Sequence, residues 1–490
     1  MGERRGYPRV VVIGGGITGL AAACRLQEGA ASRAMLIEIK LLESSARCGG
    51  VLETVRRDGF VMEAGADSFL AEKPAARNLA ERLGISSELI NTQEQFRKTL
   101  VVRLGRLTPI PEGFSLMAPT WLGPMWRSNL FSLSGKLRIA IEPWIPPRTD
   151  DEDESLAAFV TRRLGREVLE RVAQPLAGGI YTADPATLSV RATLPRFVAM
   201  EREHGSLIRG LQGAARKRNG QVRDTSGARW SLFLSFRDGI GKIVESLAEQ
   251  LDRSVQYNAR VTEVMRLPET GDARWLVRCA GGPVLEADAV ICAAPAYAAA
   301  EMIEGVAPML AAKLRGLSYA SAATVNLTYR TSDFPQPPNS FGFVVPIIEQ
   351  RKIIAGSFSS LKFAGRAPDG MIVARAFIGG ALQSRMMDLG DAQMAAAARD
   401  EFRDLFGVAA EPLCTYVRRW PNSMPQYLVG HGSRVSEIEK EARQLDNFIL
   451  AGAYLHGVGI PDCIMSGESA AEAVLARLAE PGSASRNQDG

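Results

Sequence analysis

Three glycines near the start of the chain have the spacing of a turn that binds phosphate groups. In RVVVIGGGITGLAAACRL (9–26), an apolar β-branched run leads through Gly14, Gly16 and Gly19 into an alanine-rich run. A strand, a glycine turn and a helix in this order are what a dinucleotide site requires. Gly14 permits the tight turn, Gly16 lets a pyrophosphate approach the backbone, and Gly19 lets the helix pack on the strand. We therefore expect a dinucleotide phosphate at the N-terminus of this helix.

An acidic residue follows at the distance that a bound ribose requires. The apolar run AMLIEIKLLE (34–43) predicts a second strand, and it ends at Glu43. A carboxylate in this place hydrogen-bonds ribose hydroxyls and repels a 2′-phosphate, which disfavours NADP. Arg47 and the pair Gly49–Gly50 come directly after it, and FVMEAGADSFL (60–70) then adds a third glycine-bearing segment.

The order E-x-x-x-R-x-G-G followed by E-x-G resembles the flavin-containing amine oxidase superfamily, which includes monoamine oxidases, phytoene desaturases and protoporphyrinogen oxidases. The resemblance implies FAD, with Arg47 and the glycine pair near the pyrophosphate and the flavin. Ala66 stands where the family often has proline, which loosens one turn without removing a charge or a donor. Because the C-terminal part lacks the cysteine pattern of covalent flavoproteins, we expect FAD to be bound non-covalently.

Two later segments resemble the other FAD-binding segments of this superfamily. SFRDGIGKIVESLAEQL (235–251) predicts a glycine turn and an amphipathic helix, with strands after it, and the resemblance implies a backbone contact of Val261 with the adenine side. NFILAGAYLHGVGIPDCIMSG (447–467) predicts a strand, a loop and a helix beginning near Pro461, whose N-terminus would stabilise negative charge on the reduced flavin. The cofactor-binding set that the resemblance implies is Gly14, Gly15, Gly16, Ile17, Thr18, Gly19, Glu43, Arg47, Gly49, Gly50, Val51, Gly65, Ala66, Asp67, Ser68, Val261, Trp420, Val458, Gly459 and Ile460.

Four further blocks narrow the resemblance to porphyrinogen oxidases of heme and chlorophyll synthesis. They are QPLAGGIYTADPATLS (174–189), GSFSSLKFAGRAPDG (356–370), RRWPNSMPQYLVGH (418–431) and GVGIPDCIMSG (457–467). The resemblance implies FAD-dependent oxidation of protoporphyrinogen IX to protoporphyrin IX, with molecular oxygen as acceptor and hydrogen peroxide as product. Oxidation of coproporphyrinogen III to coproporphyrin III is the alternative. No catalytic side chain is expected, because FAD takes the hydride and the substrate nitrogens and solvent manage the protons.

The substrate is an apolar disc with carboxylate edges, so its pocket should be apolar with a few cations. The resemblance implies that Arg97 pairs with a propionate, with Lys98 as a neighbouring alternative. It also implies that the backbone of Gly179 lies against the macrocycle, although a plain turn glycine would have the same signature. The strands expected at 324–329 and 341–346 should supply apolar walls.

Two other classes of protein remain open at this point. One is a flavin oxidase or desaturase that acts on amines or carotenoids. The other is a non-catalytic escort protein with an FAD fold, and the intact glycine, acid and arginine set argues against it.

Composition excludes several functions. The 58 basic and 54 acidic residues nearly cancel, so a nucleic-acid partner is not expected. Six cysteines without a CxxC pair predict reduced core thiols, and three scattered histidines predict no metal site. Neither a signal peptide nor a run long enough to cross a bilayer is visible, which indicates a cytoplasmic protein.

The segment 110–147 differs from the rest of the chain. It contains Trp121, Trp126 and Trp144 with interspersed cations, as is typical of peripheral contact with the cytoplasmic face of a membrane. A lobe for substrate entry without lipid contact is the alternative, and the composition also allows a homodimer.

The expected fold class is therefore α/β. A discontinuous, Rossmann-like FAD-binding domain of the GR2 type would span 1–92, 232–305 and 412–480. An α+β substrate-binding domain would span 93–100, 205–231 and 306–411, and a mainly helical membrane-associated lobe would span 101–204. A disordered tail would occupy 481–490.

Overall fold

A computed structural model of the chain describes residues 7–221, 232–267, 275–282 and 284–479, with β1 (Arg9–Ile13) at the centre of a five-stranded parallel sheet. The strand order is β12 (Val255–Gln256), β2 (Glu38–Leu42), β1, β16 (Ala289–Cys292) and β22 (Phe448–Leu450). Every residue of β1 is buried, which confirms the central parallel strand predicted from its apolar run. The sheet takes strands from the beginning, the middle and the end of the chain, so this unit is discontinuous.

Two apolar cores flank the sheet, because alternate residues of β1 point to opposite faces. Val10 and Val12 join the core formed with α1 (Ile17–Ser32), α2 (Ala75–Arg82), α11 (Gly241–Gln250) and α17 (Ile460–Ala479). Val11 and Ile13 join a second core. Its other members come from the antiparallel strands β13 (Val261–Arg266), β14 (Trp275–Cys279) and β15 (Val284–Ala287), and from α12 (Ala296–Ile303), α13 (Pro308–Arg315) and α16 (His431–Ala442).

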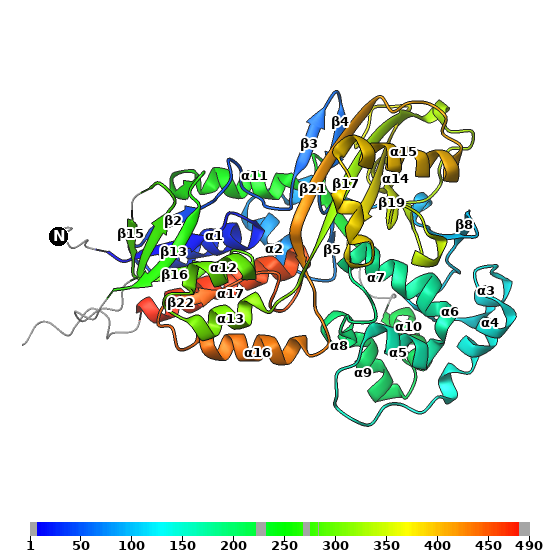
Figure 1. Cartoon of the computed structure of the whole chain (residues 1–490), viewed down its shortest axis with the longest axis horizontal. Coiled ribbons are helices and arrows are strands. Elements are labelled where there is room, and N and C mark those ends of the chain that lie inside the picture. Colours follow the sequence, from blue (N-terminus) through cyan, green and yellow to red (C-terminus); the bar gives the residue numbers. More distant parts are fainter. Residues whose placement is uncertain (1–6, 222–231, 268–274, 283, 480–490) are drawn as a thin grey trace, which may run out of the picture.

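A seven-stranded sheet forms a second unit, at the upper right of Figure 1. Its order is β21 (Cys414–Pro425), β17 (Tyr319–Arg330), β20 (Met371–Gly379), β19 (Ala355–Phe358), β18 (Gly342–Val344), β7 (Thr99–Arg103) and β8 (Arg106–Pro109). Neighbouring strands are antiparallel except β18 and β7, which are parallel. Helix α15 (Asp391–Phe406) contributes Met394, Ala398 and Phe402 to the core of this unit.

A helical lobe lies below the seven-stranded sheet in Figure 1. It contains α3 (Leu122–Arg127), α4 (Leu133–Ala140), η3 (Glu142–Trp144), α5 (Leu156–Leu164), α6 (Arg166–Val168), the π-helical turn η4 (Leu169–Ala173), α7 (Gln174–Tyr181), α8 (Val190–Thr193), α9 (Pro195–His204) and α10 (Leu207–Gln221). One apolar cluster joins these helices to Val344 and Ala355 of the sheet above them.

Short elements connect the three units. They are β3 (Thr54–Arg57), β4 (Phe60–Glu63), β5 (Phe69–Leu70), η1 (Ser86–Glu88), β6 (Leu89–Asn91), η2 (Glu94–Phe96), β9 (Phe114–Ser115), β10 (Ala118–Pro119), β11 (Phe233–Phe236), η5 (Asp252–Ser254), η6 (Thr331–Asp333), η7 (Ile347–Glu349), α14 (Ser359–Lys362) and η8 (Ala381–Asp388).

Three segments lie in a different unit from the one expected. Strands β7 and β8 belong to the seven-stranded sheet, although 101–204 was expected to form the helical lobe. Strand β21 joins the same sheet, although it falls within 412–480. Helix α10 packs on α9 and η3, so it lies with the helices, although 205–231 was expected in the substrate-binding domain. The whole tail expected at 481–490 and residues 222–231 fall outside the described ranges.

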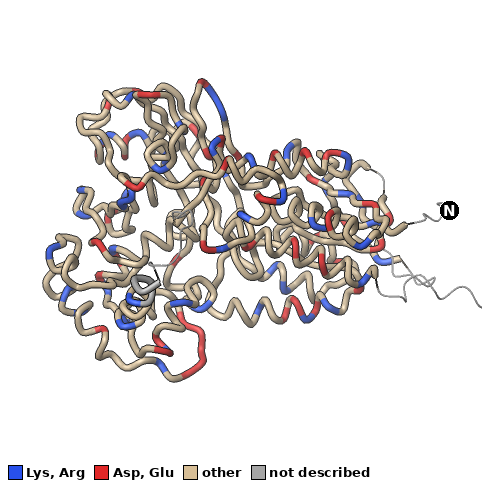
Figure 2. The backbone as a smooth tube through the Cα atoms, turned by 180° about the vertical axis from the view of Figure 1, so that it is seen from behind, with Lys and Arg blue, Asp and Glu red and all other residues tan. Residues whose placement is uncertain are grey.

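Basic and acidic residues are interspersed along all three units (Figure 2), as the near balance of 58 and 54 charged residues requires. The six cysteines are unpaired, and only Cys414 is not buried. Among the helices of the described ranges, none is long and apolar enough to cross a membrane.

Candidate cofactor and substrate site

The glycine turn has the geometry that its spacing predicts. Gly14 has a φ of +101°, which a residue with a side chain rarely adopts. A Cβ added at Gly19 would lie 1.9 Å from the Gly14 carbonyl oxygen, so α1 packs on the turn only because Gly19 lacks one. A Cβ added at Gly16 would meet no protein atom within 4 Å. The face of Gly16 is therefore open, and it fits a pyrophosphate. Ile17 and Thr18 begin α1 and are buried.

Glu43 lies directly against this turn. Its carboxylate accepts the backbone N–H groups of Gly15 and Ser45, each at 2.7 Å, and only 9% of the residue is exposed. The N–H of Ala259 donates to the Glu43 carbonyl at 2.8 Å, which brings the strand that begins at Val261 to the same place. The acid and Val261 thus lie at one end of the turn, where the adenosine half of the cofactor is expected.

Arg47 braces the loop that covers the other side of the turn. Its guanidinium donates to the carbonyls of Gly50 at 2.6 Å and Cys48 at 3.0 Å and pairs with Glu53 at 2.9 Å. The Gly49 N–H in turn donates to the Gly15 carbonyl at 2.8 Å. Arg47 is therefore a structural brace of this loop and not a solvated surface charge.

The segment 63–68 lies between the glycine loops and the seven-stranded sheet. A Cβ added at Gly65 would lie 1.9 Å from the Val51 carbonyl oxygen, so Gly65 and Val51 are in close contact. The indole N–H of Trp420 donates to the Ala64 carbonyl at 2.7 Å, and Ala66 is half-buried beside it. The structure thus brings Trp420, from β21, to the N-terminal part of the predicted set.

Asp67 binds two cations, Lys362 at the end of α14 and Arg375 on β20 of the seven-stranded sheet. Its carboxylate accepts Lys362 Nζ at 2.8 Å, Arg375 Nη2 at 3.2 Å and the Ser68 hydroxyl at 2.6 Å. Burial alone would raise the pKa of Asp67, but Lys362 and Arg375 outweigh it and hold that pKa well below its ordinary value. The carboxylate is therefore ionised at neutral pH.

The loop before α17 completes the predicted set. Val458 and Gly459 precede the helix, which begins at Ile460 as predicted from Pro461. A Cβ added at Gly467 would lie 2.1 Å from the Thr18 carbonyl oxygen, so α17 packs closely on α1, and the two helices lie side by side in Figure 1.

The two predicted substrate residues lie on other elements than this set. Gly179 is in α7 and exposed, so its interpretation as a turn glycine is wrong; a Cβ there would lie 3.9 Å from both Val344 and Ala355. Arg97 is exposed at the end of η2, and its guanidinium makes no ion pair within the described ranges. The structure shows no contact between them.

Sequence reasoning missed the side chains that the seven-stranded sheet directs at segment 63–68. Arg375 donates to the Gly65 carbonyl at 3.0 Å, Asn326 donates to the Glu63 carbonyl at 3.1 Å, and Thr324 donates to the Ala64 carbonyl. The available signal was an arginine inside the otherwise apolar strand MIVARAFIG, because a charge in a buried strand requires a partner.

The chain is similar to known proteins over nearly its whole length. The sequence profile of the family described as flavin containing amine oxidoreductase matches residues 17–475. The coproporphyrinogen III oxidase of Bacillus subtilis (strain 168) is 34% identical over 474 residues, which cover 96% of this chain and 99% of that protein. Protoporphyrinogen oxidase 2, chloroplastic/mitochondrial, of Arabidopsis thaliana is 26% identical over 499 residues, with 96% and 94% covered.

A solved structure gives the same result. The crystal structure of a protein from Exiguobacterium sp. 255-15, provisionally assigned as a protoporphyrinogen oxidase, matches with a TM-score of 0.82 and 28% identity, covering 97% of this chain and 100% of that one. The chain is therefore an FAD-dependent oxidoreductase, and it belongs to the flavin containing amine oxidoreductase family.

Proposed function

We propose that this flavoenzyme oxidises coproporphyrinogen III to coproporphyrin III, with molecular oxygen as acceptor and hydrogen peroxide as product. The observation that carries the proposal is the 34% identity to a coproporphyrinogen III oxidase over 99% of that protein, against 26% to a plant protoporphyrinogen oxidase. In each round a hydride leaves a methylene bridge and a proton leaves an N–H group. Oxygen takes up the two electrons and two protons as hydrogen peroxide, and the rounds repeat until the macrocycle is aromatic.

The chain's own residues would orient the reactants and exclude water, while bound FAD supplies the hydride acceptor. The amides of Val458, Gly459 and Ile460 at the start of α17 would stabilise negative charge on the reduced flavin. Non-covalent binding of FAD is supported by Cys463, which lies in α17 three residues after Ile460. Burial raises the pKa of its thiol to about 12, so it stays protonated and is a poor nucleophile.

Two features support a porphyrinogen as substrate. The exposed backbone of Gly179 lies beside the side chains of Val344 and Ala355, so its surroundings are apolar, as those of a macrocycle should be. The guanidinium of Arg97, exposed and without an ion pair in the described ranges, is free to pair with a propionate.

Protoporphyrinogen IX is the second candidate substrate, because the Exiguobacterium structure carries that provisional assignment. It has two vinyl groups where coproporphyrinogen III has two more propionates. The test is incubation of the FAD-loaded enzyme with each porphyrinogen in air, with porphyrin fluorescence and peroxide measured. With coproporphyrinogen, we expect porphyrin and peroxide to exceed the autoxidation control, with one peroxide formed for each hydride removed. Fluorescence that does not exceed autoxidation for either substrate would refute a porphyrinogen oxidase.

The helical lobe carries an exposed apolar stripe that supports peripheral membrane contact. Leu133, Leu137 and Ile141 follow each other at helical spacing and are 69%, 53% and 50% exposed, and Trp144 is 76% exposed. A stripe of this kind inserts into the headgroup region of a membrane. In co-sedimentation with anionic vesicles, L133Q/L137Q should bind severalfold less than wild type. M309Q, which removes an apolar side chain that is 66% exposed on α13, should bind as wild type does. Equal binding of all three proteins would refute the membrane proposal.

A further inference from the structure

The block PQYLVGH (425–431) was singled out by its sequence, but the FAD site as described gives it no role. We propose that Tyr427 and His431 are positioning residues that hold the loop at 453–457, and through it the amides of Val458–Ile460, against the flavin. The inference rests on the proposed contact of those amides with the flavin, and it is independent of which substrate is oxidised.

The two rings form a buried stack. Their centroids are 3.9 Å apart, the ring planes differ by 13°, and 3% of Tyr427 and 4% of His431 is exposed. Such contact between two buried rings fixes both side chains.

Each ring makes one hydrogen bond to the loop that leads to the flavin. The Tyr427 hydroxyl donates to the Ala453 carbonyl, and Nε2 of His431 lies 2.9 Å from the Leu455 carbonyl oxygen. A carbonyl oxygen only accepts, so Nε2 carries the proton. Nδ1 of His431 is buried and has no hydrogen-bond partner in the described ranges, and burial lowers the pKa of the ring. His431 is therefore a neutral donor committed to this carbonyl.

The loop forms a turn at 453–455, and hydrogen bonds from outside add to the one that closes this turn, from the Leu455 N–H to the Gly452 carbonyl at 3.3 Å. Before the loop, the Gly452 N–H donates to the Ser466 hydroxyl at 3.0 Å. After it, the Cys463 N–H donates to the Gly459 carbonyl at 3.0 Å, inside α17. Between these points, Tyr427 and His431 bind the carbonyls of Ala453 and Leu455, and His456 Nε2 lies 2.6 Å from Glu439 Oε1, so the block and α16 together fix the turn.

The block itself is firmly held by the neighbouring units. The Gln426 side chain donates to the carbonyl of Tyr181, the last residue of α7, at 3.1 Å. The Ser189 N–H donates to the Tyr427 carbonyl at 2.8 Å, and the Gly430 N–H donates to Asp153 at 2.8 Å. The block thus links the wall that carries Gly179 to the loop that faces the flavin.

The test compares the flavin of four variants with that of wild type, and it needs no porphyrinogen. Y427F keeps the ring stack and loses only the hydroxyl. H431L loses the donor, and H431Q keeps a donor of similar reach. Y454F is the matched control, because the Tyr454 hydroxyl is buried in the same loop without a hydrogen-bond partner in the described ranges.

We expect Y427F and H431L to raise the FAD dissociation constant about tenfold, as loss of one buried hydrogen bond predicts. We also expect a lower two-electron midpoint potential and a changed flavin absorbance band, because the amides no longer stabilise the reduced ring. H431Q should lie within about threefold of wild type in FAD affinity, and Y454F should match wild type in all three measurements.

The proposal is overturned if Y427F keeps the wild-type FAD affinity and potential, or if Y454F shifts both equally. A role confined to folding would lower the unfolding temperature of the apo and FAD-bound proteins without moving the potential, and that result also overturns it. If H431L does not fold, Y427F and Y454F decide the question. If the variants show the expected flavin shifts but the enzyme does not oxidise a porphyrinogen, only the proposed function is refuted, and the positioning role stands.

Discussion

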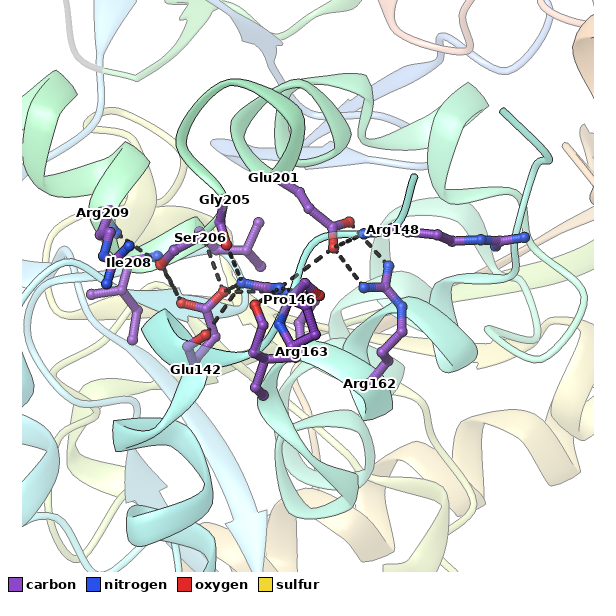
Figure 3. A network of polar contacts seen from close by, with 12 residues as sticks. Glu142, Pro146, Arg148, Arg162, Arg163, Glu201, Gly205, Ser206, Ile208 and Arg209 are labelled. Carbon is purple, nitrogen blue, oxygen red and sulfur yellow. Dashed lines mark hydrogen bonds and ion pairs between the residues drawn. The ribbon is translucent and has the colours of Figure 1, made fainter. Parts of the chain in front are cut away.

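The segment 63–68 and the helical lobe both bury charged side chains, but they use them differently. Around 63–68, Lys362 from α14 and Arg375 from β20 converge on Asp67, near the glycine turn where the face of Gly16 is open. In the lobe, Arg163 and Glu142 are both fully buried and bind only one another and their neighbours (Figure 3).

The lobe network fastens the exposed apolar stripe to the helices beneath it. Glu142 lies between Ile141 and Trp144 and accepts Arg163 Nε and the Leu207 N–H, both at 2.9 Å, and the Ser206 hydroxyl. Arg163 also donates to the Ile145 carbonyl at 2.9 Å and the Gly205 carbonyl at 3.0 Å. Segment 63–68 and the lobe together indicate that a buried charge marks a functional site only where it adjoins open space for a ligand.

Loss of Arg163 should have the largest effect. R163L leaves the Glu142 carboxylate buried without its cation, which costs about 3–5 kcal/mol of unfolding free energy. R166L is the control, because Arg166 pairs with Glu170 with a side chain that is 82% exposed. Urea unfolding should show a much smaller loss for R166L. Equal losses in the two variants would show that the buried network does not hold the lobe.

Loss of the Asp67 charge should come next, at about 2–3 kcal/mol near pH 7. D67N leaves Lys362 and Arg375 without their carboxylate. Because the folded pKa of Asp67 lies below its ordinary value, the carboxylate stabilises the fold fully above the ordinary pKa of about 3.9 and loses this effect as pH falls through the folded value. The difference in unfolding free energy between wild type and D67N should therefore be largest above about pH 5 and shrink below about pH 4. A difference that does not change with pH would contradict the ion-pair account.

G16A tests whether the cradle is a ligand site. The added Cβ meets no protein atom within 4 Å, so the apo protein should unfold as wild type does. The same Cβ occupies the place expected for the pyrophosphate, so FAD affinity should fall at least about tenfold, or about 1.4 kcal/mol. G213A, also in open space but inside α10, should leave FAD affinity unchanged and raise the unfolding free energy by up to about 1 kcal/mol, because alanine replaces glycine within a helix. Unchanged FAD titration of G16A would place the cofactor elsewhere.

W420F should have the smallest effect, about 1 kcal/mol, because it removes one hydrogen bond to the Ala64 carbonyl. Guanidinium unfolding of the FAD-bound protein measures it. W126F, at a tryptophan that is 40% exposed on the lobe, should be neutral. A larger loss for W126F than for W420F would reverse the ranking of the two regions.

The parts of the site that were predictable are the local ones. Gly14, Gly16, Gly19 and Glu43 act within a short stretch, so their spacing predicts the turn and the acid beside it, and the family resemblance adds Arg47. Strand β1 was predictable because its apolar run permits only a central position.

The contacts of 63–68 were not predictable, because they depend on strand register. Thr324 and Asn326 are two residues apart on β17, so they point to the same face of the sheet. Arg375 on β20 lies directly opposite Asn326 and points to that face as well. Nothing in the sequence says that this face meets residues 63–65. The same holds in the lobe, where Glu142, Arg163 and Ser206 carry no motif and become partners only through helix packing.

The most direct test of the account is the ratio of kcat/KM for coproporphyrinogen III to that for protoporphyrinogen IX, measured with the FAD-loaded enzyme in air. We predict a ratio of at least about ten, equal to about 1.4 kcal/mol of preferential transition-state binding, because the additional propionates of coproporphyrinogen III can pair with exposed cations such as Arg97. R97L should lower kcat/KM for coproporphyrinogen III while leaving FAD affinity unchanged. A ratio of one or below would contradict coproporphyrinogen as the substrate.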